Sequence, residues 1–540
     1  MGSTHATTPV RDMPPVGWGD PDRRTGLPPQ AAAWLQAEIG LPVAPASPGP
    51  VRVTASTLGD LSLAALICAV GPEHVLLEDP ARLLRAAGKS YLDLVRMRSG
   101  SVGAPDAVVL PGTAAEVRAV LAACAAHGLT VVPFGGGTSV VGGVSPVGPS
   151  PVVSLDLRRM DRLLSVDPVS LTAVFEPGVR GPGAEALLAA HGLTLGHFPQ
   201  SFEYATIGGF AATRSAGQAS SGYGRFDEMV LGLVVQTPAG ELRLGRGAAS
   251  AAGPDLLGLM LGSEGAFGVI TEVTVRVRPK PKSGRYEAFF FKTWEDGLAA
   301  LRALEQAGLA PDVARLSDPD ETRVQLTLAG TGGLKGRLGR KVLSARGYAT
   351  GCLAILGWDG TTASIADRRK VVLPVLKSRG AMSVGTSIGE RWKHGRYDGP
   401  YLRDDLLDAG ALVETLETSA LWSQLPATWA AVRTALSAQL PGCVVMCHVS
   451  HLYPQGASLY FTVLAAQSTT DPVTQWQNAK DAAGHALVAS GATITHHHAV
   501  GADHRPWMTD EVGALGVEVL KAVKAVLDPT GMLNPGKLIP

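Results

Sequence analysis

Three histidines, a tyrosine and two arginines in the second half of this 540-residue chain have side chains suited to acid–base and anion-binding chemistry. The segment TITHHHAVG places His496, His497 and His498 in succession, and Tyr453 directly precedes a Pro-Gln-Gly turn between two predicted strands. Imidazole can gain or lose a proton near neutral pH, so the histidine run is a candidate for general acid–base catalysis.

Two arginines could supply a permanent positive charge. Arg403 lies in LRDD near a predicted helix start, and Arg315 lies in ARLSD. A guanidinium stays charged and binds phosphate through two parallel donors. Each arginine also has aspartates nearby in the sequence, so a solvated surface ion pair is the alternative reading. Tyr453 likewise could be a hairpin aromatic that only packs on its neighbour.

The histidine run is also a candidate for a metal site. We predict that it lies at the end of a short strand, where His496 and His498 would share one face and His497 the other. This alternation would keep the three imidazoles from converging, and the sequence has no CxxC or HExxH partner motif. The sequence therefore predicts no metal site.

Three segments rich in small residues precede residue 271. The first, PFGGGTSVVGG, has glycines that can turn successive N–H groups inward, which suits a pyrophosphate. It lacks the lysine of a P-loop and the GxGxxG spacing, so a tight turn without a ligand is the alternative. The second, FPQSFEYATIGGFAATRSAG, leaves room for a planar ligand and offers hydroxyl donors, and the third is LGSEGAFGVITE.

Length and composition set limits on the elements that must position these residues. The 540 residues exceed one ordinary domain, and the formal net charge is +0, so no global charge favours nucleic acid or an anionic membrane. No apolar run approaches the roughly 20 residues needed to span a bilayer. Five cysteines without paired spacing argue for a reducing compartment, and the N-terminal residues show no secretory signal.

The sequence predicts a β-α-β unit whose second strand leads directly into the first glycine segment. We predict a strand at 108–110, a helix capped by Thr113 and stopped by Gly128, and a second strand at 129–133. Strands then recur to about residue 282, and a second α+β domain follows. The predicted organisation is an N-terminal region (1–103), a cofactor-type domain (104–281), a cap (282–500) and a helical C-terminal segment (501–540).

Residues 104–281 resemble the FAD-binding domain of the vanillyl-alcohol oxidase/p-cresol methylhydroxylase superfamily, because the three small-residue segments match its signature segments in order. The resemblance implies an α+β fold with two α/β subdomains that hold FAD between them, and an α+β cap. The glycine loop has no histidine, so we expect noncovalent FAD. The residues implied to bind it are Pro133, Phe134, Gly135, Gly136, Gly137, Thr138, Ser139, Gln200, Ser201, Tyr204, Ala205, Thr206, Gly208, Gly209, Thr213, Arg214, Ser215, Ala216, Glu264, Gly265, Gly268, Val269 and Ile270.

The chain also resembles the alkyldihydroxyacetonephosphate synthase family, from VGWGD (16–20) through LRDD and HLYPQGASLYF to HHHAVG. The resemblance implies that acyl-dihydroxyacetone phosphate exchanges its acyl group for a fatty alcohol, through an adduct at flavin N5 and without net redox. It assigns proton transfer to Tyr453, substrate phosphate to Arg403, and catalytic roles near the flavin to Arg315 and the histidine run. The turn here is PQG, where animal members have a DAG-type turn.

This resemblance implies long-chain substrates, an apolar tunnel in the cap and contact with a membrane surface. We expect a cytoplasmic protein, with peripheral contact on the inner face of the membrane as an open option. No nucleic-acid partner is expected, and a homodimer is left open. The absence of a peroxisomal C-terminal signal agrees with this expectation.

Two other functions stay open at this stage. An FAD-dependent dehydrogenase or oxidase of a 2-hydroxy acid, such as D-lactate or glycolate, would also need a histidine base and an arginine for the carboxylate. The segment LDPTGMLNPGKL is shared with such enzymes and does not discriminate. A flavin-binding or lipid-binding module without activity is the non-enzymatic alternative.

Overall fold

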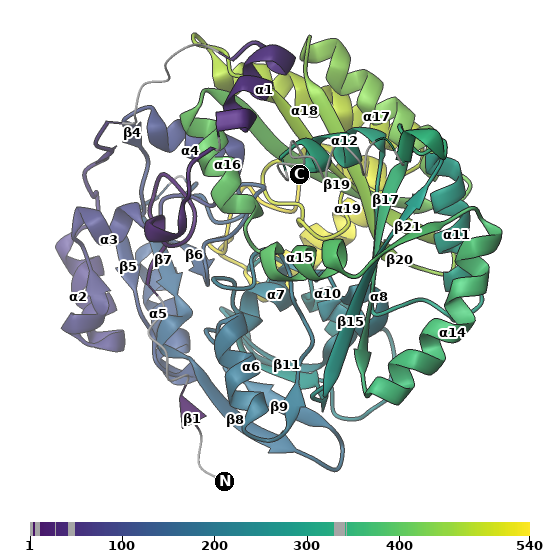
Figure 1. The fold of residues 1–540 in the computed structure, drawn as a ribbon. Helices are drawn as coiled ribbons and strands as arrows, with labels where there is room; N and C mark the ends of the chain where they lie inside the picture. The colour runs from purple at the N-terminus through teal and green to yellow at the C-terminus, as the bar shows by residue number, and fades with distance from the viewer. Residues whose placement is uncertain are drawn as a thin grey trace.

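The computed structural model describes residues 4–5, 11–27, 29–41, 49–148, 150–328, 341 and 343–540. In Figure 1 the first of two lobes lies at the left, the second lies at the bottom, and the cap lies at the right and top. The first lobe contains a four-stranded sheet with the order β3-β5-β7-β6, in which the last three strands are parallel. Its strands are β3 (Val75–Leu76), β5 (Ala107–Val109), β7 (Val152–Asp156) and β6 (Thr130–Phe134). The predicted β-α-β unit is therefore present, with β7 inserted between its two strands.

Helix α5 (Ala114–His127) connects β5 to β6, as expected from its sequence. The hydroxyl of Thr113 accepts from the amide of Glu116 at the start of the helix, and Gly128 ends it with a left-handed φ of 64°. Its apolar side packs with α2 (Asp60–Val70) in the core of this lobe. At the edge of the sheet, Leu533 from the distant C-terminal segment pairs in parallel with Val131 of β6.

The second lobe contains a six-stranded antiparallel sheet with the order β1-β8-β9-β13-β11-β12. Short helices and α19 cover it, and its core includes Phe175, Phe210 and Phe226. The strands are β1 (Thr4–His5), β8 (Arg162–Asp167), β9 (Thr172–Phe175), β13 (Val269–Arg276), β11 (Val230–Thr237) and β12 (Gly240–Leu244). The helices are α6 (Gly181–Ala189), α7 (Ile207–Thr213), α8 (Ser220–Tyr223), α9 (Phe226–Met229), α10 (Leu256–Met260) and α19 (Met508–Leu527), and β10 (Leu193–Thr194) pairs with β14 (Arg278–Pro279).

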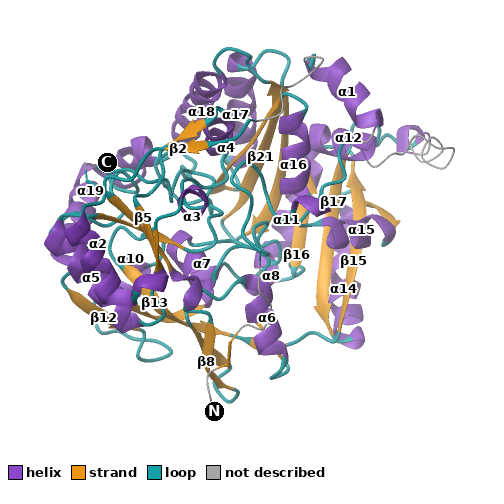
Figure 2. Cartoon of the chain, turned by 90° about the vertical axis from the view of Figure 1, so that its left-hand side faces the viewer, coloured by secondary structure: helices purple, strands orange, loops and turns teal. Residues whose placement is uncertain are grey.

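The cap is a seven-stranded antiparallel sheet with helices on both faces. Its strands, in order across the sheet, are β18 (Met382–Gly385), β15 (Ser283–Phe291), β17 (Cys352–Gly360), β16 (Val313–Ser317), β20 (Val444–Leu452), β21 (Gly456–Ala466) and β19 (Ala411–Leu421). Four helices pack on the outer face: α11 (Trp294–Gln306), α14 (Thr362–Ser378), α17 (Leu425–Gln439) and α18 (Pro472–Ala489). The inner face is flanked by α1 (Pro29–Ile39), α12 (Pro319–Leu328), α15 (Ser387–Gly395) and α16 (Gly399–Asp408), as Figure 2 shows from the side.

The N-terminal region lies across the junction of lobe and cap. Lys89 donates to the Pro14 carbonyl over 2.6 Å, and the Trp18 amide donates to the Asp404 carboxylate over 2.5 Å. Arg24 forms an ion pair with Asp405 at 2.6 Å. The remaining elements of this region are α3 (Asp79–Leu83), α4 (Tyr91–Arg98), β2 (Arg52–Val53) and β4 (Ser101–Val102).

None of the described helices is both long enough and apolar enough to cross a membrane. All five cysteines carry free thiols in the structure. The α+β architecture, with two lobes and a cap, confirms the predicted fold class.

Candidate functional site

A cavity of about 580 Å³ lies where the two lobes meet the inner face of the cap sheet. All three small-residue segments contribute to its lining, together with cap strands and the histidine run. Of the predicted cofactor residues, the wall includes Pro133, Phe134, Gly135, Gly136, Gly137, Thr138, Ser139, Gln200, Ser201, Ala205, Thr206, Gly208, Gly209, Thr213, Ser215, Ala216, Glu264, Gly265, Gly268 and Ile270.

Three predicted cofactor residues lie outside this wall. Tyr204 packs edge-to-face on Trp18, and Val269 belongs to the core of the first lobe. Arg214 turns away, and its Nε donates to the Leu261 carbonyl over 3.0 Å. Their positions support the segments that bear the cofactor residues, without lining the cavity.

The first glycine segment fits tightly against the second. A Cβ added to Gly136 would lie 2.1 Å from the Tyr204 carbonyl oxygen, and one added to Gly135 would lie 2.5 Å from Oγ1 of Thr206. Among the described residues, no acceptor pairs with the amide N–H of Gly136, Gly137 or Thr138. Unpaired amides beside a cavity are the donors that a pyrophosphate requires, so this segment fits the phosphates of FAD.

Glu264 joins the third segment to the C-terminal part of the chain. Its carboxylate accepts from the amides of Val500 and Gly501, at 2.9 Å and 2.8 Å, and Asn534 donates to the Glu264 carbonyl over 2.7 Å. Burial raises the pKa of Glu264 to about 7, although the two amides favour its ionised form. We call the three small-residue segments that line the cavity the cradle. The buried carboxyl group of Glu264 therefore holds the cradle to the loop that follows the histidine run.

On the inner face of the cap sheet, the side chains change from ionisable to apolar over three neighbouring rows of paired residues. The strand register pairs His448 with Tyr460 and Tyr460 with Glu417 in the first row. In the next row Thr462 pairs with both Met446 and Thr415, and in the third Leu464 pairs with both Val444 and Val413. Since directly paired residues share a face, the wall passes from ionisable through mixed to apolar side chains.

The histidine run lies in a loop, so the expected strand alternation is wrong. Residues 490–507, all of which the structure describes, contain no strand. The buried carboxylate of Glu417 accepts from the amides of His496, His497 and His498, at 2.7 Å, 3.1 Å and 2.9 Å. Three successive amides that converge on one anion curl the backbone, which an extended strand does not permit.

This curl brings the histidine side chains together. His496 Nδ1 and His497 Nδ1 are 2.9 Å apart, and His451 of β20 joins them, so that each of the three offers one nitrogen within 4.8 Å of the others. The premise behind the prediction of no metal site is therefore wrong. In the structure these nitrogens have protein partners: for example, His451 Nε2 is 2.9 Å from the Gly217 carbonyl.

The charge on Glu417 is set by its surroundings. Burial opposes ionisation, but the imidazoles of His497 and His498 hold the pKa of Glu417 well below its ordinary value. Its Oε2 lies 3.3 Å from His497 Nδ1. Burial lowers the pKa of His496 well below its ordinary value and lowers that of His498 to about 3.

Tyr453 and His496 lie behind the cavity wall, whereas His497 and His498 line it. The Tyr453 hydroxyl is 2.6 Å from Nε2 of His496, and the guanidinium of Arg225 lies beside it. Burial raises the pKa of Tyr453 above its ordinary value. Tyr453 is therefore connected to the cavity through the histidine run.

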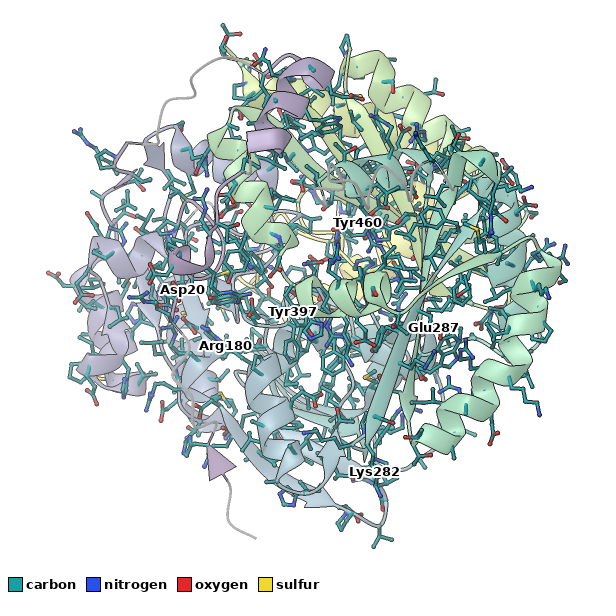
Figure 3. The ribbon with its side chains drawn as sticks, viewed as in Figure 1. Asp20, Arg180, Lys282, Glu287, Tyr397 and Tyr460 are labelled. Atoms are coloured by element: carbon teal, nitrogen blue, oxygen red, sulfur yellow. The ribbon has the colours of Figure 1, made fainter. Side chains whose placement is uncertain are left out.

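Tyr460 is a cavity residue that the sequence did not reveal (Figure 3). Its ring stacks on His448 at 4.9 Å and on His497 at 5.9 Å between centroids. Burial raises the pKa of Tyr460 to about 12. His448 and His451 were missed as well, although His451 and Tyr460 lie in the segment HLYPQGASLYF and His448 lies three residues before its start.

Both predicted arginines line the cavity. Arg315 donates to Glu321, and His448 Nδ1 lies 2.9 Å from its Nη2. Burial opposes ionisation of Glu321, but Arg315 and His448 lower the pKa of Glu321 to about 2. Arg403 donates to the Lys89 carbonyl over 2.5 Å. Each arginine also has a buried Nε–H that has no acceptor among the described residues.

An apolar limb extends the cavity away from the histidines, toward α1, α12 and α16. The described residues of the cap sheet that line it, Val413, Met446 and Leu464, carry no ionisable side chain. The residues that line it are Leu27, Ala31, Trp34, Leu35, Val324, Leu328, Leu406, Val413, Met446 and Leu464. This limb has the character of the expected tunnel for a hydrocarbon chain.

Comparison with known proteins identifies both halves of the chain. Residues 105–245 match the family model "FAD binding domain", and residues 280–538 match "FAD linked oxidases, C-terminal domain". A solved structure of an alkyldihydroxyacetonephosphate synthase has a TM-score of 0.81 at 28% identity, covering 97% of this chain and 99% of that one. p-Cresol methylhydroxylase shares the fold, with a TM-score of 0.67 at 17% identity over 88% of this chain and 96% of its own.

Sequence comparison narrows the family further. Alkyldihydroxyacetonephosphate synthase from Trypanosoma brucei brucei is 34% identical over 486 residues, and that from Dictyostelium discoideum is 33% identical over 482; each match covers 87% of this chain and 79% of the relative. A mitochondrial D-lactate dehydrogenase from Arabidopsis thaliana is more distant, at 26% over 470 residues, covering 82% of this chain and 74% of its own. These matches confirm the fold class, the FAD cofactor and the resemblance drawn from the motifs. The chain belongs to the alkyldihydroxyacetonephosphate synthase family.

Proposed function

We propose that this chain is an FAD-dependent alkyldihydroxyacetonephosphate synthase, which exchanges the acyl group of acyl-dihydroxyacetone phosphate for a fatty alcohol without net redox. The observation that carries the proposal is the gradient on one face of the cap sheet, from His448 and Tyr460 to Leu464 and Val413. A phosphorylated substrate with a long chain needs a cationic polar end and an apolar end within one cavity. A small 2-hydroxy acid has no hydrocarbon chain that would occupy the apolar limb.

The three small-residue segments would hold FAD, with the unpaired amides of Gly136, Gly137 and Thr138 on its pyrophosphate. Bound FAD supplies the nucleophilic nitrogen that the exchange requires. Arg403 would bind the substrate phosphate and Arg315 would act near the flavin, since both residues line the cavity. The apolar limb would hold the hydrocarbon chain and exclude water from it.

The groups that can transfer protons are the first row of the cap sheet, which contains His448 and Tyr460, and the histidine loop. His497, His498 and Tyr460 line the cavity, so they can exchange a proton with a bound alcohol or carboxylate. Tyr453 and His496 would act from behind the wall. Glu417 would fix the loop that presents the histidines.

The test is incubation of the purified flavoprotein with acyl-dihydroxyacetone phosphate and a labelled fatty alcohol. The expected result is a labelled ether product, together with release of one fatty acid for each ether formed. Anaerobic addition of D-lactate or glycolate should leave the flavin spectrum oxidised. Rapid bleaching of the flavin by either hydroxy acid, without ether formation, would favour a dehydrogenase.

We further propose that the chain works at a membrane surface as a peripheral protein, because both of its proposed substrates carry long chains. Helices α1 and α12 flank the apolar limb and would face the lipid. Sedimentation with lipid vesicles tests this contact, and failure to sediment would contradict it. The homodimer remains a prediction, which sedimentation velocity at several protein concentrations can test.

A further inference from the structure

The proposed exchange reaction produces a proton in the buried cavity, and this proton must be released to solvent. The C1–O bond to the acyl group breaks and its electron pair leaves with the carboxylate, while the alcohol oxygen bonds to C1 and the alcohol loses its proton. A fatty acid has a pKa of about 4 to 5, so near pH 7 it departs ionised and one proton is left behind in each turnover. His451 and His496, at the ionisable end of the cavity, are both buried.

A continuous set of short contacts runs from the cavity wall toward the surface. His497 lines the cavity, and its Nδ1 lies 2.9 Å from Nδ1 of His496. Nε2 of His496 lies 2.6 Å from the Tyr453 hydroxyl. Tyr453 is partly exposed, and the two residues that follow it, Pro454 and Gln455, are exposed. Both links are within hydrogen-bonding distance.

We propose that His497, His496 and Tyr453 form a proton exit path from the cavity to solvent. The inference rests on the proposed function, which generates the proton. His497 receives it at the nitrogen not bonded to His496 and passes a proton from Nδ1 to His496. His496 passes one from Nε2 to Tyr453, whose hydroxyl proton leaves to water. His496 and Tyr453 act through His497 and are positioning residues in this sense.

The groups around the path favour movement of the proton along it over a stable charge on any one residue. Glu417 Oε2 lies 3.3 Å from His497 Nδ1, so its charge stabilises the proton on arrival. Burial disfavours a lasting charge on His496, and Arg225 beside the Tyr453 hydroxyl opposes a cation there. His451 is a side branch, because its Nε2 faces the Gly217 carbonyl and its Nδ1 faces the Ser458 hydroxyl at 3.0 Å.

The experiment compares the full-length holoenzyme with Tyr453→Phe and His496→Gln, and with Tyr348→Phe as a matched control. Tyr348 donates to the Gly380 carbonyl in an exposed part of the cap, so its variant loses a hydroxyl whose partner is not a residue of the path. We expect Tyr453→Phe to lower kcat by about 10-fold to 100-fold, with FAD content and KM unchanged. The solvent isotope effect on kcat should rise, and Tyr348→Phe should match the wild type.

Added imidazole separates a blocked path from a damaged site. As a mobile proton acceptor, it should restore the rate of Tyr453→Phe in proportion to its concentration, and should do so for His496→Gln as well. Two results would overturn the path but not the proposed function, provided that the wild type carries out the exchange. The first is a Tyr453→Phe variant with the same kcat as the wild type, and the second is a slow variant whose rate imidazole does not increase. Absence of exchange in the wild type would overturn the proposed function and the path with it.

Discussion

The cofactor cradle and the histidine wall face the same cavity but are built from different materials. The cradle consists of backbone and small residues, with unpaired amides at Gly136, Gly137 and Thr138. The wall consists of large polar side chains from β20, β21 and a loop, and the buried Glu417 of β19 holds that loop in place. The cradle should therefore fail when atoms are added to it, and the wall should fail when one charge is removed.

The first way to test this difference is the variant Glu417→Gln, for which we expect the largest effect. An amide can no longer offer two charged oxygens to three backbone N–H groups, so the histidine loop should lose its curl. We expect exchange activity to fall by about 100-fold or more, and the free energy of unfolding by roughly 2 to 4 kcal/mol. Flavin absorbance should show that FAD remains bound. Loss of FAD in parallel with activity would contradict the separation of wall and cradle.

The reciprocal test is Gly136→Ala, which adds one methyl group to the cradle. Because the new Cβ would lie 2.1 Å from a backbone oxygen, the first and second segments must move apart. We expect the dissociation constant for FAD to rise by about 10-fold or more. Gly247→Ala is the control, since a Cβ at that position meets nothing within 4 Å. Normal FAD affinity in Gly136→Ala would show that the cradle tolerates added volume.

A third prediction concerns the positive charge that Arg403 of α16 adds to the cavity beside the wall. Replacing Arg403 by Ala should raise KM for the phosphorylated substrate by about 10-fold, as expected for loss of roughly 1.5 kcal/mol of charge-assisted binding. KM for the fatty alcohol should not change, because the alcohol carries no phosphate. Steady-state kinetics with each substrate varied in turn will distinguish the two. An unchanged KM for the phosphorylated substrate would refute this role.

The smallest expected effect compares the two buried carboxyl groups through pH. The pKa of Glu264 rises from an ordinary 4.5 to about 7 in the fold, so between these values unfolding releases a proton. Stability should therefore fall by roughly 2 kcal/mol as pH rises from 5 to 8. Glu264→Gln should remove this dependence, as measured by denaturant unfolding at each pH. Glu417, whose pKa is lowered, should contribute its stability throughout this range.

The cradle could be predicted from sequence because its information is local. Consecutive glycines and the Thr113 cap lie beside the structures they specify, so the β-α-β unit and α5 were predicted within a residue or two. Helix α11 (Trp294–Gln306) is also specified locally, because the Thr293 hydroxyl accepts from the Asp296 amide at its start. In these segments hydrophobic spacing and capping act over a few residues.

The wall could be predicted only in part because distant residues determine it. The curl of the histidine loop depends on Glu417, which lies on another strand and shows no local pattern. Tyr460 and His448 meet because the register of β20 and β21 pairs them, and a sequence does not display its register. The run itself and Arg403 were identifiable as residue types, but the short strand predicted before the histidines was wrong.

The pairing of Leu533 with Val131 has a consequence for the order in which this protein matures. During translation β6 emerges long before the segment that covers its edge, and the strand leads directly into the loop for the flavin phosphates. Until synthesis reaches Asn534, that edge is open to incorrect partners, and the third segment lacks the side chain that fastens it. Cofactor loading should thus be a late event in biogenesis, and an excised fragment spanning 104–281 should aggregate before it acquires any yellow colour.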